Sequence, residues 1–275
     1  MDPLQLAPLA IVAVMYGVRV RTLDQRGQAP RRLRIASYAA GIAVFALAIL
    51  PPIEQLGKEL FLFHMLQHVL LGDLAPLLVV LGLTGPVLRP VLAVRTLDRL
   101  RVLAHPLVAL PLWALNLYVW HIPALYEAAV RHSAVHALEH LTFFTAGALM
   151  WAAVVEVLPG PEWFGTGWKL GYVVVVRALE TVLANVFLWS GTVFYGVYVR
   201  DTQRWGISPL EDQGHAGTIM MAEGGAVTLA ALAWLFLRLA REGELRQQLL
   251  EEGVDPRAAR RAVRYGRGED LRPAR

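Results

Sequence analysis

The dominant pattern along the chain is a series of long apolar stretches separated by short polar segments. Each apolar stretch is close to the ~20 residues that an α-helix needs to cross the hydrocarbon core of a bilayer. Seven stretches are predicted as membrane spans, and they cover residues 4–20, 35–53, 60–83, 105–121, 135–158, 170–197 and 214–238. The predicted fold is therefore all-α, a polytopic membrane helix bundle of seven transmembrane helices.

The distribution of lysine and arginine predicts the orientation of these helices. With the N-terminus outside, the inner segments are 19–34, 84–104, 159–169 and the residues from Arg238 onward. They contain 21 of the 26 basic residues, the outer segments contain four, and Arg177 lies within the sixth stretch. The positive-inside rule then predicts an outer N-terminus and a cytoplasmic C-terminus. It also explains the net charge of +4 without a nucleic-acid partner.

The same charge pattern predicts two domains. Residues 1–240 form the seven-helix transmembrane domain, and residues 241–275 form a charged cytoplasmic tail. Within the tail, Asp255 reads as an N-cap with Pro256 at the first helical position, so a short basic helix is predicted to about Tyr265. This helix is expected to be solvated or to contact lipid headgroups, with docking of a partner protein as the alternative.

The composition limits the possible chemistry. Hydrophobic residues make up 56% of the chain and charged residues 17%, as expected for a membrane protein. The absence of cysteine excludes disulfides, thiolate zinc sites and iron–sulfur clusters, so a metal would have to bind His, Met, Asp or Glu. Motifs for phosphate loops, dinucleotide binding, HExxH zinc proteases and GxSxG hydrolases are absent as well.

Histidines supply the candidate metal site. His64 and His68 are four residues apart near the outer end of the third span, and His136 and His140 repeat this spacing in the fifth. Residues four apart lie on one face of a helix, so each pair can chelate an ion. Seven of the eight histidines fall on the outer side, and His121 and His215 lie there at the ends of the fourth and seventh spans.

Nitrogen donors without thiolate favour copper or zinc. Some further residues near the histidines are secondary candidates as ligands, namely Met65, Asp73, Met220 and Glu223. Five acidic residues near the outer face could add a carboxylate, namely Glu59, Asp73, Glu127, Glu139 and Asp212. A carboxylate-rich iron site fits this set less well than copper does.

Four stretches of the chain carry a family resemblance. They are HMLQHVLLGDLAPLLVVLG (64–82), WHIPALYEAAV (120–130), HALEHLTFFTAGALMW (136–151) and FYGVYVRDTQRWGISPLEDQGHAGTIMMAEGG (194–225). In this order they resemble the CtaG-type cytochrome c oxidase assembly factor family, which is associated with caa-type oxidases. With the pattern of spans, the resemblance covers residues 35–238.

The resemblance implies a multi-pass protein of the bacterial inner (plasma) membrane that helps to mature a haem–copper oxidase. It implies a copper chaperone and not an enzyme, with an oxidase subunit as partner and possible transfer from a copper donor protein. By motif position it implies a functional set of His64, His68, His121, His136, His140, Asp212 and His215. The copper would be held transiently.

Three alternatives use the same residues differently. A membrane b-type cytochrome would use the histidines as axial ligands, but two imidazoles on one helix face cannot bracket a haem, so haem is not favoured. A metal-dependent membrane enzyme would hold its metal tightly and turn over a substrate. An assembly scaffold without metal would use the histidines structurally.

Overall fold

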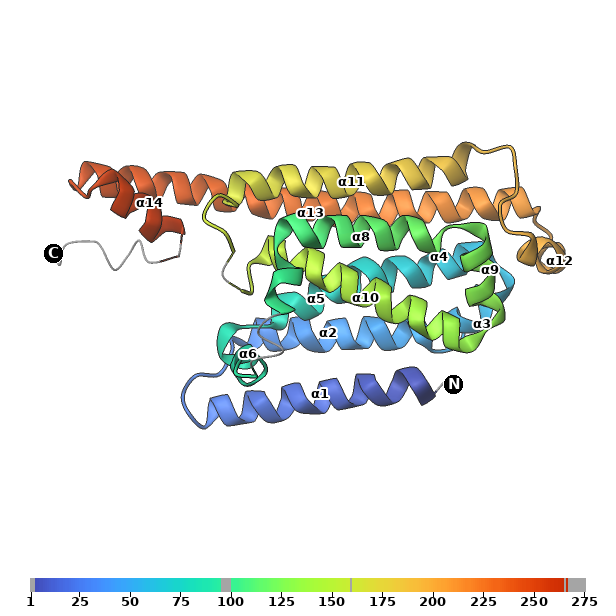
Figure 1. Ribbon diagram of the computed structural model, residues 1–275, viewed down its shortest axis with the longest axis horizontal. Helices are drawn as coiled ribbons and strands as arrows, with labels where there is room; N and C mark the ends of the chain where they lie inside the picture. The colour runs from blue at the N-terminus through green and yellow to red at the C-terminus, as the bar shows by residue number, and fades with distance from the viewer. Residues whose placement is uncertain (1–2, 95–99, 159, 265, 267–275) are drawn as a thin grey trace. The chain divides into compact units, whose positions relative to one another are not determined.

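The computed structural model describes residues 3–94, 100–158, 160–264 and 266, and in these residues it is helical without β-strands (Figure 1). The α-helices are α1 (Pro3–Asp24), α2 (Arg32–Ile49), α3 (Ile53–Glu59), α4 (Phe61–Val69), α5 (Ala75–Gly82), α6 (Gly85–Leu92), α8 (Pro106–Trp120), α9 (Pro123–Arg131), α10 (Ser133–Val155), α11 (Thr166–Trp189), α12 (Val199–Thr202), α13 (Pro209–Glu251) and α14 (Pro256–Arg264). The shorter turns are η1 (Leu70–Leu74), η2 (Leu100–Ala104), η3 (Gly196–Tyr198) and η4 (Gln203–Trp205).

Six helical segments are long and apolar enough to cross a membrane, judged by length and composition. They are Leu6–Asp24, Arg32–Ile49, Phe61–Gly82, Ser133–Val155, Thr166–Trp189 and Pro209–Glu251. A seventh span results if the bent pair α8 and α9 is counted as one. These spans confirm the predicted membrane helix bundle, while the orientation of the termini stays a prediction.

The bend between α8 and α9 has a cause in the sequence. The two helices meet at an angle of 74°, and Pro123 opens α9. Proline has no backbone N–H to donate to the preceding turn, and it disfavours helical backbone at Ile122 before it. Ile122 accordingly has extended backbone angles. The bend places His121 at the corner between the two helices.

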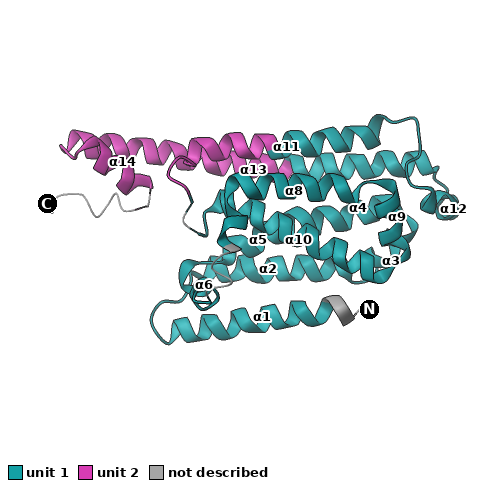
Figure 2. Ribbon diagram, in the orientation of Figure 1, with its two compact units in different colours: residues 1–160, 176–225 teal, residues 161–175, 226–275 magenta. Residues whose placement is uncertain are grey.

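The chain forms two compact units (Figure 2). The first comprises residues 1–160 and 176–225, and the second comprises residues 161–175 and 226–275. Helix α13 continues without a break past residue 240, where the charged tail is predicted to begin. The functional boundary between membrane domain and tail stays a prediction.

In the first unit, the span that carries the first histidine pair contains a π-helical turn. The span begins as α4, passes through η1 and continues as α5. The N–H of Ala75 bonds to the carbonyl of Leu70, five residues back, and Pro76 follows with no N–H to donate. Such turns are common at functional sites in helices. Here the turn carries Asp73, whose carboxylate accepts a hydrogen bond of 2.5 Å from the Trp151 indole of α10.

Helix α10 passes very close to this π-helical turn, and Gly147 makes the approach possible. A Cβ atom on Gly147 would lie 2.0 Å from the Gly72 carbonyl oxygen. That oxygen belongs to the backbone, so it can move away only if the helix moves with it. We expect Gly147→Ala to lower the free energy of unfolding by about 1–3 kcal/mol through overpacking. Thermal unfolding in detergent measures this loss. Gly171→Ala is the control, because a Cβ there meets nothing within 4 Å, and an equal loss in both variants would contradict the prediction.

Of the two C-terminal helices, α13 is longer than the sequence predicted, and α14 has the N-cap that the sequence predicted. Helix α13 runs over Pro209–Glu251, well beyond the predicted span 214–238. The prediction followed hydropathy, whereas Glu, Arg, Gln and Leu are good helix formers outside the bilayer as well. The predicted cap of the next helix is confirmed: Asp255 Oδ1 accepts bonds of 3.0 Å from the N–H groups of Arg257 and Ala258, and α14 begins at Pro256.

Candidate metal centre

The structure brings the two histidine pairs together between α4 and α10. The ring centroids of His64 and His68 are 4.4 Å apart, and those of His136 and His140 are 4.0 Å apart. Between the helices, the His64 and His136 rings are 5.2 Å apart. All four side chains are buried, with at most 6% of any residue exposed.

Glu139 of α10 lies at the centre of this cluster. Its Oε2 is 3.5 Å from Nε2 of His64, and its Oε1 is 3.4 Å from Nε2 of His68. Glu139 also completes a triad with His136 and His140 on its own helix. In each of the two triads the ligand atoms lie within 4.8 Å of one another, so one carboxylate is shared by both.

From the sequence alone, Glu139 was only one of five acidic candidates, and the predicted site did not include it. A signal was present, because Glu139 lies three residues after His136 and directly before His140. Residues three apart share a helix face. A carboxylate on the face of an HxxxH pair in a membrane span was therefore a candidate ligand.

Several ligand atoms of the cluster are buried without a hydrogen-bond partner in the described part of the chain. They are Nε2 of His64, both ring nitrogens of His68, Nε2 of His121, Nε2 of His136 and both carboxylate oxygens of Glu139. Buried polar atoms are normally paired, and a buried carboxylate in a membrane is costly without a counter-charge. A metal cation among these atoms would satisfy the nitrogen lone pairs and neutralise the carboxylate. The residues therefore fit a metal ion.

His121 stands beside the first histidine pair at the corner of α8 and α9. Its ring centroid is 5.8 Å from that of His68. Its Nδ1 lies 2.6 Å from the carbonyl oxygen of Leu117, so Nδ1 carries the proton and donates it. The tautomer leaves the lone pair on Nε2, as is usual for histidines that bind metal.

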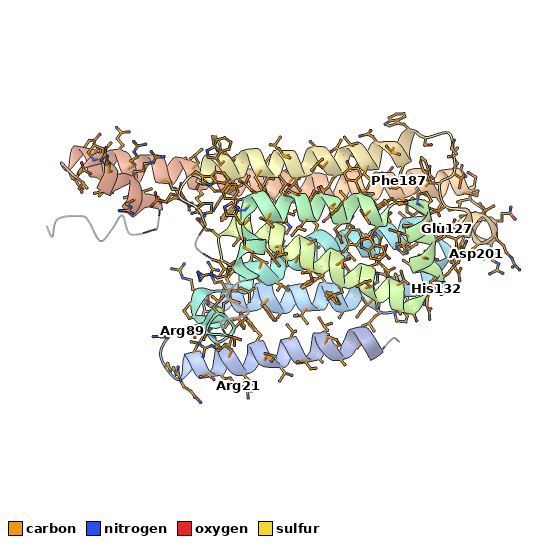
Figure 3. All side chains as sticks on the ribbon, viewed as in Figure 1. Arg21, Arg89, Glu127, His132, Phe187 and Asp201 are labelled. Carbon is orange, nitrogen blue, oxygen red and sulfur yellow. The ribbon has the colours of Figure 1, made fainter. Side chains whose placement is uncertain are left out.

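Aromatic side chains enclose the cluster. Tyr126 of α9 is fully buried, and its ring centroid is 4.7 Å from that of His64. The Tyr198 hydroxyl donates to the carbonyl of Gly57 at 3.2 Å, so the bond of 2.9 Å between Tyr126 and Tyr198 is donated by Tyr126. Phe187 of α11 (Figure 3) packs 5.7 Å from the ring of His121. The sequence analysis did not single out these residues.

Asp212 has a different position from the histidines. It lies in the first turn of α13, and its two oxygens accept bonds of 2.7 and 3.0 Å from the N–H groups of Phe61 and Leu62. These N–H groups open α4, so Asp212 caps the helix that carries His64 and His68. The structure thus gives Asp212 a capping role, and its role as a ligand stays a prediction.

The remaining histidines lie apart from the two triads. His215 of α13 is exposed, so it does not join the buried cluster, and its role as a ligand stays a prediction. His132 at the start of α10 is exposed as well (Figure 3), in line with its exclusion from the predicted site. His105 caps α8 instead, accepting the N–H of Leu107.

The secondary candidates line a small cavity together with two histidines. The cavity has a volume of about 40 Å³, enough for one or two water molecules. His68 and His121 line one side of it, and the other lining residues include Met65, Asp73, Met220 and Glu223. The four residues predicted as secondary candidates therefore line the same cavity as His68 and His121.

Comparison with known proteins identifies the family. The model of the family described as cytochrome c oxidase caa3 assembly factor matches residues 14–242. The chain belongs to the cytochrome c oxidase caa3 assembly factor family. The resemblance found in the sequence motifs is confirmed, and the family is one of oxidase assembly factors.

The relatives that match this chain are longer bacterial proteins. The chain is 24% identical over 254 residues to the uncharacterized proteins Mb0105 of Mycobacterium bovis and MT0111 of Mycobacterium tuberculosis. It is 20% identical over 231 residues to ML1998 of Mycobacterium leprae. These matches cover 84% and 76% of this chain, but only 38% and 34% of the relatives' length. No solved structure matches the chain significantly.

Proposed function

We propose that this assembly factor binds copper between α4 and α10 and delivers it to a haem–copper cytochrome c oxidase. The observation that carries the proposal is the position of Glu139, which is buried between the two HxxxH pairs and whose carboxylate oxygens have no hydrogen-bond partner among the described residues. A carboxylate flanked by four imidazoles is a set of ligands for a cation. The family's role in oxidase assembly supplies a use for that cation.

The donor set supports copper over the hard cations. Imidazole nitrogens suit copper and zinc, while magnesium and calcium need more oxygen ligands than one carboxylate provides. His64, His68 and Glu139 would form one half of the site, and His136 and His140 the other, with His121 next to them. Met65, fully buried beside His64, places a thioether in the same region and favours Cu(I).

The enclosed site has a consequence for delivery. Cargo must leave, yet each of these histidines is at most 7% exposed, and Tyr126 and Tyr198 close the space beside them. Release therefore requires the aromatic residues to move. We infer that docking of a client opens this cover.

The site is proposed to exchange copper with two partner proteins at a bacterial membrane. The client is a cytochrome c oxidase subunit, and a copper donor protein loads the site at the predicted outer face of the membrane. The bacterial plasma membrane is the proposed location, because the relatives are bacterial and several helices are long and apolar enough to span a bilayer. The role is that of a chaperone and involves no turnover of a substrate.

Metal analysis of the purified protein tests the copper site. We expect the wild type to contain copper and His64→Ala combined with His136→Ala to lose it, because each triad loses a ligand. His105→Ala combined with His132→Ala is the matched control, since it also removes two histidines but none of the clustered ones. Equal copper in the wild type and the first variant would refute the site.

The optical spectrum of the same preparation tests the cytochrome alternative. We expect no Soret band, because the pairs His64/His68 and His136/His140 each lie on one helix and Glu139 lies between them. A stoichiometric Soret band that disappears with His64→Ala would favour haem instead. Oxidase assembly that survives alanine at every clustered histidine would favour a scaffold without metal.

A further inference from the structure

The second unit contains a wide basic groove, which the copper proposal does not use. It has a volume of about 990 Å³, and its walls come from the segment before α11, the first turn of α11, the C-terminal part of α13 and α14. Arginine dominates its charge, with Arg246, Arg257, Arg260, Arg261 and Arg264 against Glu162 and Glu242. The groove is therefore a candidate site for an anion.

Helix α14 directs its arginines to one side. The spacing of Arg257, Arg260, Arg261 and Arg264 places them on one helix face, while Ala259 and Ala262 are buried. Arg261 contacts Glu162 at 3.4 Å, and Arg264 donates to the carbonyl of Phe164 at 2.9 Å. Those two contacts fix the helix to the segment before α11. Arg257 and Arg260 are exposed and have no ion pair within the described residues.

The first turn of α11 adds neutral donors to the groove. Thr166 lines the groove and is 3% exposed, and its buried hydroxyl has no hydrogen-bond partner in the described residues. Gly165 and Gly167 on either side have open space where a Cβ would be. The N–H groups of a first helical turn lack partners within the helix and attract phosphate. The first turn of α11 contains no acidic residue to oppose this.

The length of α13 indicates where the groove lies relative to the bilayer. A helix of 43 residues is about 65 Å long, roughly twice the hydrocarbon thickness, so one end of α13 must leave the membrane. Its charged C-terminal part forms the groove wall. Trp163 and Trp168, 43% and 65% exposed, line the same groove, and exposed tryptophans are typical of the membrane–water interface.

We propose that this groove binds the phosphate headgroup of an anionic phospholipid. Arg257 and Arg260 contact the phosphate together with the Thr166 hydroxyl and the first N–H groups of α11. The indoles of Trp163 and Trp168 lie beside the glycerol and upper acyl chains. A lipid fits better than a soluble acidic partner, because the groove combines basic residues with exposed tryptophans next to a membrane span. The proposal does not depend on copper binding.

Native mass spectrometry of the full-length protein in detergent, titrated with phosphatidylglycerol or phosphatidylcholine, tests this proposal. We expect tighter binding of phosphatidylglycerol in the wild type. Arg257→Gln with Arg260→Gln should weaken it about 25-fold, roughly fivefold for each arginine. Arg26→Gln with Arg241→Gln is the control, because it removes the same charge from exposed residues that do not line the groove. The control should bind as the wild type does.

Thr166→Val keeps the shape of the side chain and removes only the hydroxyl, so it should weaken phosphatidylglycerol binding several-fold without lowering the unfolding temperature. Circular dichroism verifies the helix content of each variant. Equal binding of the two lipids, or unchanged binding in the arginine variant, would overturn the proposal. Inorganic phosphate that binds this groove as tightly as phosphatidylglycerol would assign it to a soluble ion instead.

Discussion

Glu139→Gln is expected to lower the copper affinity of the purified protein on the order of 100-fold, because loss of a ligand should cost at least as much as loss of a group that supports a ligand, which costs about 10- to 100-fold. The substitution removes the carboxylate that both triads share and leaves the four histidines in place. Competition titration against a chelator of known affinity measures the change. Glu127→Gln is the matched control, because Glu127 pairs with Arg131 on α9 and lies outside both triads.

Stability measurements separate the loss of a ligand from a loss of fold. In the metal-free protein, Glu139→Gln replaces a buried carboxylate whose oxygens have no hydrogen-bond partner in the part of the chain that the structure describes, so the unfolding temperature should stay equal or rise. At the same copper concentration, added copper should raise the unfolding temperature of the wild type more than that of the variant, because the stabilisation of the folded state grows with the affinity for the ligand. Unchanged copper affinity in Glu139→Gln would contradict the central position assigned to this residue.

Asp212→Ala is expected to lower the free energy of unfolding by about 2–3 kcal/mol, within the range for a lost helix cap made by a charged acceptor. Two N–H groups at the start of α4 lose their acceptor, and one of them belongs to the buried Phe61. Thermal unfolding of the metal-free protein in detergent measures this loss.

Asp212→Asn distinguishes capping from ligation. Asparagine is also a good N-cap, and its oxygen can accept one of the two bonds, so the loss of stability should be smaller than in Asp212→Ala. Copper affinity should remain close to that of the wild type, since the histidines on α4 keep their positions. A loss of copper as large as that of Glu139→Gln, with normal stability, would show that Asp212 is a ligand.

The sequence predicted those parts of the protein that depend on local pattern. Apolar length gave the spans, and the spacing of four residues identified His64/His68 and His136/His140, because helix geometry alone brings such residues to one face. The cap at Asp255 was predictable for the same reason, since donor and acceptor are within three residues.

The rest depended on contacts between distant segments. Asp212 and Phe61 are 151 residues apart, and Tyr126 and Tyr198 are 72 apart, so no local spacing in the sequence predicts these contacts. Glu139 was only one of five acidic candidates, because the sequence does not show which of them faces a second histidine pair. Only the packing of α10 against the first histidine pair shows that it is buried.

The shared carboxylate also bears on how an ion could travel. An ion held by His64, His68 and Glu139 can acquire His136 or His140 before it gives up its first histidines, since Glu139 belongs to both sets. At the proposed copper site, movement from one helix to the other would then exchange one bond at a time and would keep the ion coordinated inside the membrane. On this proposal, the shared Glu139 would connect the two chelating pairs into one path.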